Sequence, residues 1–200
     1  MKLVLVRHGR PNEEDPARPH DPPLRADGRA QAEAVAARLA LEGITRIVSS
    51  PMARALQTAQ PLADRLGLPI DIIEGWAEAD RHVARYRSTE TLRALGEVEW
   101  QRFLADPIGY FGGDAATFKA GVLAALNASV GARGAHVAVF AHGLPINVVL
   151  SHALGLERII HFAPGYASMT RLRAGAGGAI GVASVNERNH LSIESHANAH

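Results

Sequence analysis

The chain has 200 residues, of which 47% are hydrophobic and 20% are charged, a composition typical of one soluble globular domain. Its 21 basic residues (Lys and Arg) nearly balance its 20 acidic residues (Asp and Glu), which excludes nucleic-acid binding through bulk positive charge. Cysteine is absent, so disulfide bonds, thiolate zinc sites and a cysteine nucleophile are excluded as well. Ten histidines, the arginines and the carboxylates remain to carry chemistry.

The apolar run at the N-terminus, residues 3–6, ends at Arg7 and His8. A secretory signal needs about 7–15 apolar residues and a membrane-spanning helix about 20, so this run is too short for either. We therefore expect a cytoplasmic protein without a membrane partner. The run is rich in branched residues and predicts a buried central strand.

Strand and helix patterns alternate after this first strand, with an irregular proline-rich loop at 10–23. Further strands are expected at 44–48, 70–73 and 136–141, with a closing pair at 168–173 and 179–185. Helices are expected at 28–41, from the N-cap Ser50 and Pro51 to Gly67, at 115–130, and at 144–154 before Gly155.

This alternation predicts a three-layer α/β/α fold around a mixed, mainly parallel sheet. We expect residues 1–200 to form a single domain. Residues 76–112 are less regular and carry six of the ten aromatic residues, which predicts a small cap or substrate-specificity region. The tail at 191–200 is expected to be disordered.

Three of the predicted strands end in residues that can bind an anion, namely Arg7-His8-Gly9, Ser49-Ser50-Pro51 with Arg54, and His142-Gly143. Open α/β sheets bind ligands at the carboxyl ends of their strands, so we expect these residues to meet. Two arginines and two histidines predict a concave cationic site, and phosphate is its expected ligand.

Arg54 falls in the first turn of the predicted second helix, where a cation opposes the helix dipole at a cost of about 0.3 kcal/mol or more. An anion held between the helix end and the guanidinium would remove this conflict, and a solvated surface arginine is the alternative. One phosphate charge about 4 Å from one guanidinium gains about 4 kcal/mol at an effective dielectric of about 20. A dianion calls for more than one arginine, and Arg7 is the second.

With no cysteine in the chain, a neutral imidazole is an obvious nucleophile for phosphoryl transfer. One ring nitrogen attacks phosphorus, and the other must carry the proton and donate it to an acceptor. Gly9 has no side chain, so its backbone can approach His8 and offer that acceptor. Taken singly, His8 and His142 could each be a satisfied polar residue at a strand end.

Together, these segments resemble the histidine phosphatase superfamily, the phosphoglycerate-mutase-like proteins. The resemblance covers nearly the whole chain in the family's order and implies the phosphoglycerate-mutase-like fold. Its matching segments are Arg7-His8-Gly9, Pro23-Leu24 with Gly28 and Gln31-Ala32, Ser49-Ser50-Pro51 with Arg54-Ala55 and Thr58-Ala59, His142-Gly143, and Asn186 with His190-Leu191.

The resemblance implies that His8 is the phosphorylated nucleophile. It implies that Arg7, Arg54 and His142, with Gly143, bind the phosphoryl group and stabilise charge in its transition state. No cofactor is implied, and no metal is expected, because two histidines far apart in sequence give poor zinc-ligand spacing. The expected partners are the phosphorylated substrate and inorganic phosphate, without nucleic acid, and a homodimer is left open.

The family also uses an acid after its third strand, for which Glu74, Glu78 and Asp80 are the candidates. Glu78 is favoured because residues 76–81 resemble the family's acid-bearing stretch. Its implied task is to protonate the leaving alkoxide and then to activate water against the phosphohistidine. The alternative for Glu78 is a solvated loop carboxylate.

Departures from the mutase pattern favour hydrolysis. Many phosphoglycerate mutases carry a hydroxyl residue and an asparagine where this chain has Pro11 and Glu14, and polar residues where it has Leu144 and Pro145. We therefore expect a metal-independent phosphomonoester hydrolase that forms a phosphohistidine and acts on a small phosphorylated metabolite. A mutase-type phosphotransferase and a non-catalytic phosphate-binding module are the alternatives.

Charged and aromatic residues in the segment 76–112 are candidates for substrate specificity. Arg81 and Tyr86 are the first of them, and His82, Arg85 and Arg87 add positive charge nearby. The alternative is an amphipathic cap with a solvated basic face.

Overall fold

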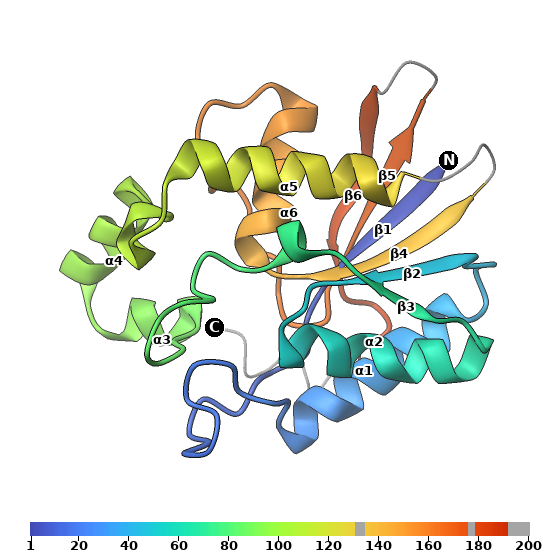
Figure 1. Ribbon diagram of the computed structural model, residues 1–200, viewed down its shortest axis with the longest axis horizontal. Helices are drawn as coiled ribbons and strands as arrows, with labels where there is room; N and C mark the ends of the chain where they lie inside the picture. Colours follow the sequence, from blue (N-terminus) through green and yellow to red (C-terminus); the bar gives the residue numbers. More distant parts are fainter. Residues whose placement is uncertain (131–134, 176–178, 192–200) are drawn as a thin grey trace.

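The computed structural model describes residues 1–130, 135–175 and 179–191. Its centre is a six-stranded sheet with the order β3-β2-β4-β1-β5-β6 (Figure 1). The strands β3, β2, β4 and β1 run parallel to one another, whereas β5 is antiparallel to β1 and β6 is antiparallel to β5, which confirms the predicted mixed sheet. The strands are β1 (Lys2–Arg7), β2 (Arg46–Ser49), β3 (Ile70–Ile72), β4 (His136–Ala141), β5 (Met169–Ala174) and β6 (Ile180–Glu187).

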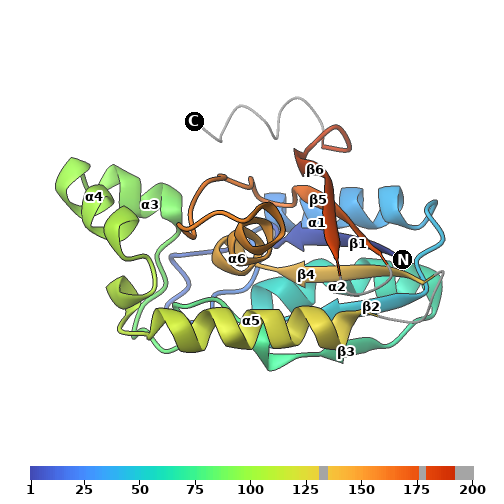
Figure 2. The same cartoon turned by 90° about the horizontal axis from the view of Figure 1, so that it is seen from above.

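Helices cover both faces of the sheet, which confirms the three-layer α/β/α fold (Figure 2). α1 and α2 pack on one face, and α5 and α6 pack on the other. None of the helices in the described ranges combines the length and the apolarity needed to cross a membrane. The four covering helices are α1 (Ala26–Leu39), α2 (Ala53–Leu66), α5 (Ala115–Ser129) and α6 (Gly143–Leu154).

The apolar run of β1 serves two separate cores. Val4 and Val6 belong to the core beneath α1 and α2, whereas Leu3 and Leu5 belong to the core beneath α5 and α6. Successive side chains of a strand point to opposite faces, so a strand covered on both faces needs an uninterrupted apolar sequence. This is the physical reason why residues 3–6 are all apolar.

The second helix begins later than predicted. Its first residue is Ala53 and its N-cap is Met52, so Ser50 is not the N-cap and Pro51 is not the first helical residue. The Ser50 hydroxyl accepts a hydrogen bond from the Met52 amide (3.2 Å), and the carboxylate of Asp21 accepts one from the Ala53 amide (3.0 Å). Side chains outside the helix therefore satisfy two amides at its start.

Most other boundaries differ from the predictions by one or two residues. The first helix is the clearest case, since it begins at Ala26 and ends at Leu39 instead of spanning 28–41. Gly67 ends α2 with a positive φ of 63°, as predicted. Residues 192–200 of the predicted tail lie outside the described residues.

The segment 76–112 contains short helices that lie beyond the carboxyl ends of the strands (Figure 1). Aromatic rings hold it together, because the Phe103 centroid lies 5.5 Å from that of Trp100, 5.7 Å from that of Tyr110 and 6.0 Å from that of Phe111. The short helices of this part of the chain are η1 (Glu74–Trp76), α3 (Thr89–Ala94), α4 (Glu97–Ala105) and η2 (Gly109–Phe111).

Candidate active site

The carboxyl ends of β1, β2 and β4 bring Arg7, His8, Arg54 and His142 together. β4 lies between β1 and β2, and all three strands run in the same direction. The four side chains are buried, and the ring centroids of His8 and His142 are 5.0 Å apart. The structure therefore assembles the four residues that the strand ends predicted.

The ring of His8 is oriented by Gly9. Nδ1 of His8 lies 2.8 Å from the Gly9 carbonyl oxygen, which can only accept, so Nδ1 carries the proton and Nε2 keeps its lone pair. A Cβ atom on Gly9 would lie 2.5 Å from the carbonyl oxygen of Gly28, so only glycine permits this approach. The Gly9 amide donates to Oγ1 of Thr58 (2.9 Å), which holds the loop in place.

Both histidines are neutral at physiological pH. Burial, followed by the positive charges of Arg54 and Arg7, lowers the pKa of His8 well below its ordinary value. Burial, the Arg54 guanidinium and His8 lower the pKa of His142 in the same direction. A neutral imidazole with a free Nε2 is the form that can attack phosphorus.

The contact with Ser50 is compatible with the tautomer of His142 in which Nδ1 carries the proton. His142 is the N-cap residue of α6, and its Nε2 lies 2.8 Å from Oγ of Ser50. Because Oγ of Ser50 accepts from the Met52 amide, its single proton can point at Nε2. In that tautomer the ring proton of neutral His142 sits on Nδ1, which is then a hydrogen-bond donor.

Replacing Ser50 with alanine is expected to release this tautomer and to weaken binding of inorganic phosphate about fivefold, the worth of one hydrogen bond of about 1 kcal/mol. Nitrogen-15 NMR of the His142 ring and a phosphate titration measure the two effects. Ser50→Thr keeps the hydroxyl and should restore both. Ser49→Ala is the matched control, since Oγ of Ser49 bonds to the Ser50 carbonyl instead. An unchanged ring tautomer in Ser50→Ala would contradict this assignment.

Arg54 is fully buried and pairs with two carboxylates. Its Nη2 donates to Oδ1 of Asp80 (3.0 Å), its Nη1 lies 3.6 Å from Oδ1 of Asp21, and its guanidinium stacks 4.3 Å from the ring centroid of Tyr86. Asp21 also accepts from the Ala53 amide at the start of α2. An anion does lie between the helix end and Arg54, as one of the two interpretations of the sequence proposed, but it is the protein's own Asp21. No local pattern marked Asp21, because it belongs to the irregular loop.

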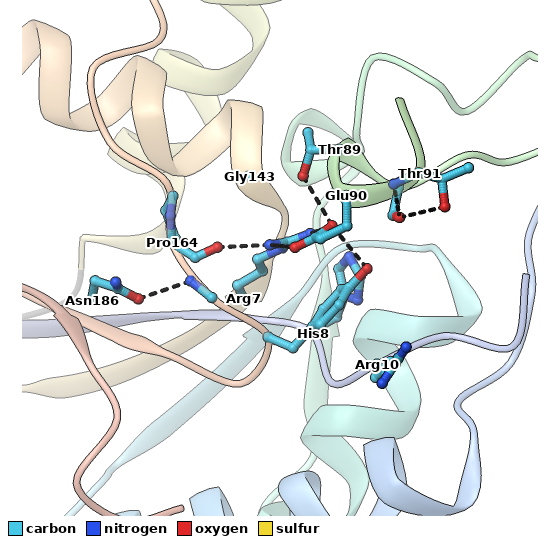
Figure 3. A network of polar contacts seen from close by, with 12 residues as sticks. Arg7, His8, Arg10, Thr89, Glu90, Thr91, Gly143, Pro164 and Asn186 are labelled. Atoms are coloured by element: carbon cyan, nitrogen blue, oxygen red, sulfur yellow. Dashed lines mark hydrogen bonds and ion pairs between the residues drawn. The ribbon is translucent and has the colours of Figure 1, made fainter. Parts of the chain in front are cut away.

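Arg7 lies in a second cluster (Figure 3). Its Nη1 and Nη2 donate to Oε1 and Oε2 of Glu90 (3.1 and 3.3 Å), and Nη1 also donates to the Pro164 carbonyl (2.7 Å). The Tyr166 ring packs on the guanidinium, 4.2 Å from the ring centroid, and the Tyr166 hydroxyl donates to Oε2 of Glu90 (3.1 Å). Burial opposes ionisation of Glu90, but the Arg7 guanidinium outweighs it and lowers the pKa of Glu90 to about 2. Sequence reasoning missed Glu90 and Tyr166, since both reach Arg7 from distant segments.

The carboxylate of Glu78 reaches the N-terminus of α6. Its Oε2 accepts from the Leu144 amide (3.1 Å) and its Oε1 from the Ala79 amide (3.0 Å), and a Cβ atom on Gly143 would lie 3.9 Å from Oε2. Burial, together with the charge of Asp80, raises the pKa of Glu78 to about 7. Glu78 can therefore donate or accept a proton near neutral pH.

The other predicted residues of this segment divide between the site and the surface. Asp80 and Tyr86 both contact Arg54, so they lie at the site. The Glu74 side chain is 67% exposed and pairs with Arg81 at 2.8 Å, so these two residues lie outside the buried cluster.

Four buried nitrogen atoms of the site have no hydrogen-bond partner in the described part of the chain. They are Nε of Arg7, Nε and Nη1 of Arg54, and Nδ1 of His142. Leaving such a group unpaired costs about 1–3 kcal/mol, so buried polar groups are normally satisfied. An anion with several acceptor oxygens would satisfy these donors next to His8. Within residues 1–130, 135–175 and 179–191, no group of three or more His, Asp or Glu side chains could hold a metal ion.

Known proteins resemble this chain in both sequence and structure. The model of the histidine phosphatase superfamily (branch 1) matches residues 3–187. The probable phosphoglycerate mutase GpmB of Proteus mirabilis is 32% identical over 165 residues, which cover 78% of this chain and 76% of that protein.

Solved structures of similar fold include two phosphatases. A phosphoserine phosphatase from Entamoeba histolytica, in complex with 3-phosphoglyceric acid, is 25% identical with a TM-score of 0.73, over 96% of this chain and 99% of that one. A mycobacterial glucosyl-3-phosphoglycerate phosphatase, in complex with VO3, is 25% identical with a TM-score of 0.75, over 94% of this chain and 99% of that one. The chain belongs to the histidine phosphatase superfamily of phosphatases and phosphotransferases, as its motifs, its fold and these relatives together show.

Proposed function

We propose that this protein hydrolyses phosphomonoesters through a phosphohistidine at His8. The observation that carries the proposal is the set of buried nitrogen atoms on Arg7, Arg54 and His142 that lack a hydrogen-bond partner among the described residues and lie beside the neutral His8 ring. These donors suit the oxygens of a phosphoryl group and would stabilise the charge that spreads over them in the transition state. The proposed mechanism uses these side chains and no metal ion.

In the first step, Nε2 of His8 attacks phosphorus, so an N–P bond forms and the ester P–O bond breaks. Glu78 gives its proton to the leaving oxygen, which departs as a neutral alcohol. In the second step, the Glu78 carboxylate takes a proton from water, whose oxygen attacks phosphorus while the N–P bond breaks. Inorganic phosphate leaves, and both side chains return to their starting states. A pKa of about 7 suits Glu78 to both tasks.

A phosphate-binding module without catalysis would need no acid at the site. Glu78 contacts the N-terminus of α6, and its pKa is raised to about 7, and both observations support catalysis over binding alone. This supports an enzyme that turns over its ligand.

We propose that the substrate is a small metabolite with a second anionic group. A pocket of about 390 Å³ is lined by Tyr86 and by more cations than anions: four arginines, Arg10, Arg25, Arg85 and Arg87, against two glutamates, Glu13 and Glu14. This pocket is close to the site, because the Tyr86 ring also packs on the Arg54 guanidinium. The similar phosphatases are named for phosphoserine and glucosyl-3-phosphoglycerate, which are small phosphate esters.

A mutase-type phosphotransferase is the second candidate, because the related GpmB protein is named a probable phosphoglycerate mutase. Pro11 and Glu14 favour hydrolysis, since they replace the polar residues that many mutases carry there. One experiment separates the two reactions. Purified protein is incubated with phosphorylated hydroxy acids and sugars in excess chelator, and both inorganic phosphate and isomerised product are quantified.

Hydrolysis predicts release of inorganic phosphate that chelator does not inhibit. Isomerised product without free phosphate would instead identify a mutase. Activity that chelator removes would contradict a metal-independent mechanism. Binding without turnover of any compound would leave the non-catalytic module.

A further inference from the structure

The phosphate-binding candidate Arg7 is already occupied by an internal carboxylate (Figure 3). Both oxygens of Glu90 accept from its guanidinium, at 3.1 and 3.3 Å, in the two-pronged geometry with which arginine also binds phosphate. The Tyr166 hydroxyl and Thr89 Oγ1 each donate to Oε2 of Glu90 at 3.1 Å. Arg7 is buried, and a buried cation without a counter-charge is destabilising, so the Glu90 carboxylate stabilises Arg7 in the absence of a bound phosphoryl group.

Glu90 approaches Arg7 from the first turn of α3, and a separate contact holds that helix to the loop after β1. Oε2 of Glu13 accepts from the Ser88 amide (3.3 Å) and from Oγ1 of Thr91 (2.8 Å). Glu13 therefore docks α3 without contacting the arginines. Two different carboxylates therefore act on α3: Glu13 holds the helix, and Glu90 contacts Arg7.

The carboxylates of the site outnumber its arginines, which disfavours binding of a further anion. The two arginines, Arg7 and Arg54, pair with three carboxylates, Glu90, Asp80 and Asp21. A phosphoryl group on His8 therefore shares the arginines with like charges, which weakens its binding. The side chain of Asp80 is only 3% exposed, whereas that of Glu90 is 45% exposed and can turn toward solvent.

We propose that Glu90 is an internal competitor of the phosphoryl group for Arg7. Its carboxylate neutralises the buried guanidinium between turnovers, gives way when a phosphoryl group binds, and returns to Arg7 as inorganic phosphate leaves. Glu90 thereby sets a low affinity for the product. The inference rests on the proposed phosphatase function, since it assumes that Arg7 receives the phosphoryl group.

The test is calorimetric titration of the full-length protein with inorganic phosphate. Glu90→Gln keeps an oxygen that can accept from Arg7 but removes the charge, so phosphate should bind about tenfold more tightly. The inhibition constant of phosphate in an assay with an aryl phosphate should fall by the same factor. Glu97→Gln is the matched control, since it removes a carboxylate charge from the first turn of the neighbouring helix α4, where Glu97 contacts Gln101. Its phosphate affinity should stay within about twofold of the wild type.

A second measurement needs no substitution. Hydrogen exchange of the α3 amides, residues 89–94, should speed up when phosphate is added to the wild-type protein, because the Glu90 contact is lost. Unchanged or weaker phosphate binding by Glu90→Gln, an equal gain in Glu97→Gln, or slower α3 exchange would each overturn the inference. Failure of the proposed hydrolysis would appear as absent turnover of the aryl phosphate, whereas failure of this inference would appear in the titrations with inorganic phosphate, so the two failures are distinguishable.

Discussion

Replacing His8 with alanine is expected to reduce phosphomonoester hydrolysis on the order of 10⁴-fold, because the variant lacks the nucleophile. Nε2 of His8 is the atom that would form the N–P bond, and the Gly9 carbonyl holds the ring in the tautomer that leaves this atom free. The rate is measured with an aryl phosphate in excess chelator. In the wild-type protein, acid-labile and alkali-stable phosphate should also be trapped on the chain during turnover.

Two further variants make this result specific. His8→Asn places an amide donor near the Gly9 carbonyl, so it should fold normally and remain inactive. His152→Ala removes an exposed histidine of α6 and should retain full activity. Undiminished hydrolysis by folded His8→Ala, or phosphate trapped on that variant, would refute a phosphohistidine at His8.

Replacing Glu78 with glutamine is expected to slow hydrolysis of an alkyl phosphate about 10²–10⁴-fold, the usual contribution of a general acid. An aryl phosphate needs little protonation of its leaving group, so its first step should survive. The second step still lacks a base, so the variant should release one equivalent of the aryl alcohol in a burst and then accumulate phosphohistidine. Stopped-flow measurement of the burst, with quantification of the phosphorylated protein, checks both expectations.

The pH dependence follows from the same residue. Burial and the charge of Asp80 raise the pKa of Glu78 to about 7, so the carboxyl group is protonated below this pH and ionised above it. The rate with an alkyl phosphate, where protonation of the leaving group limits turnover, should therefore fall as the pH rises above about 7. This decline should disappear in Glu78→Gln.

Glu74→Gln is the matched control, because Glu74 lies in the same segment, pairs with Arg81 and faces solvent. It should show neither the burst nor a changed pH profile. If Glu74→Gln slowed the alkyl phosphate as much as Glu78→Gln, the acid would be misassigned. If Glu78→Gln kept the decline above pH 7, another group would be responsible for it.

The site residues at the ends of the predicted strands could be found from local sequence pattern alone. Arg7 and His8 follow an apolar strand, and His142 follows another, so the rule for parallel sheets was enough to bring them together. The role of Gly9 was also predictable, because a close backbone approach requires a residue without a side chain. The start of α2 was not predictable, since Asp21, 32 residues away in the sequence, accepts a hydrogen bond from the Ala53 amide.

The partners of the arginines were beyond the reach of sequence reasoning. Arg54 was expected to face an anion, but nothing in the spacing showed that Asp21 and Asp80 would supply it. Glu90 and Tyr166 lie 83 and 159 positions from Arg7 in the chain, yet they contact one another at 3.1 Å. Arg81 illustrates the opposite case, since it was a candidate for the site and pairs instead with Glu74 at the surface.

By itself, the sequence determined the family, the α/β/α architecture and the histidines and arginines at the strand ends. Strand and helix periodicity is local, and parallel strands bring their carboxyl ends to one edge of the sheet. Only the tertiary structure decided which carboxylates lie against those arginines and which histidine nitrogens are free. Long-range contacts set burial and charge pairing, and these in turn decide protonation, as the neutral histidines and the raised pKa of Glu78 show.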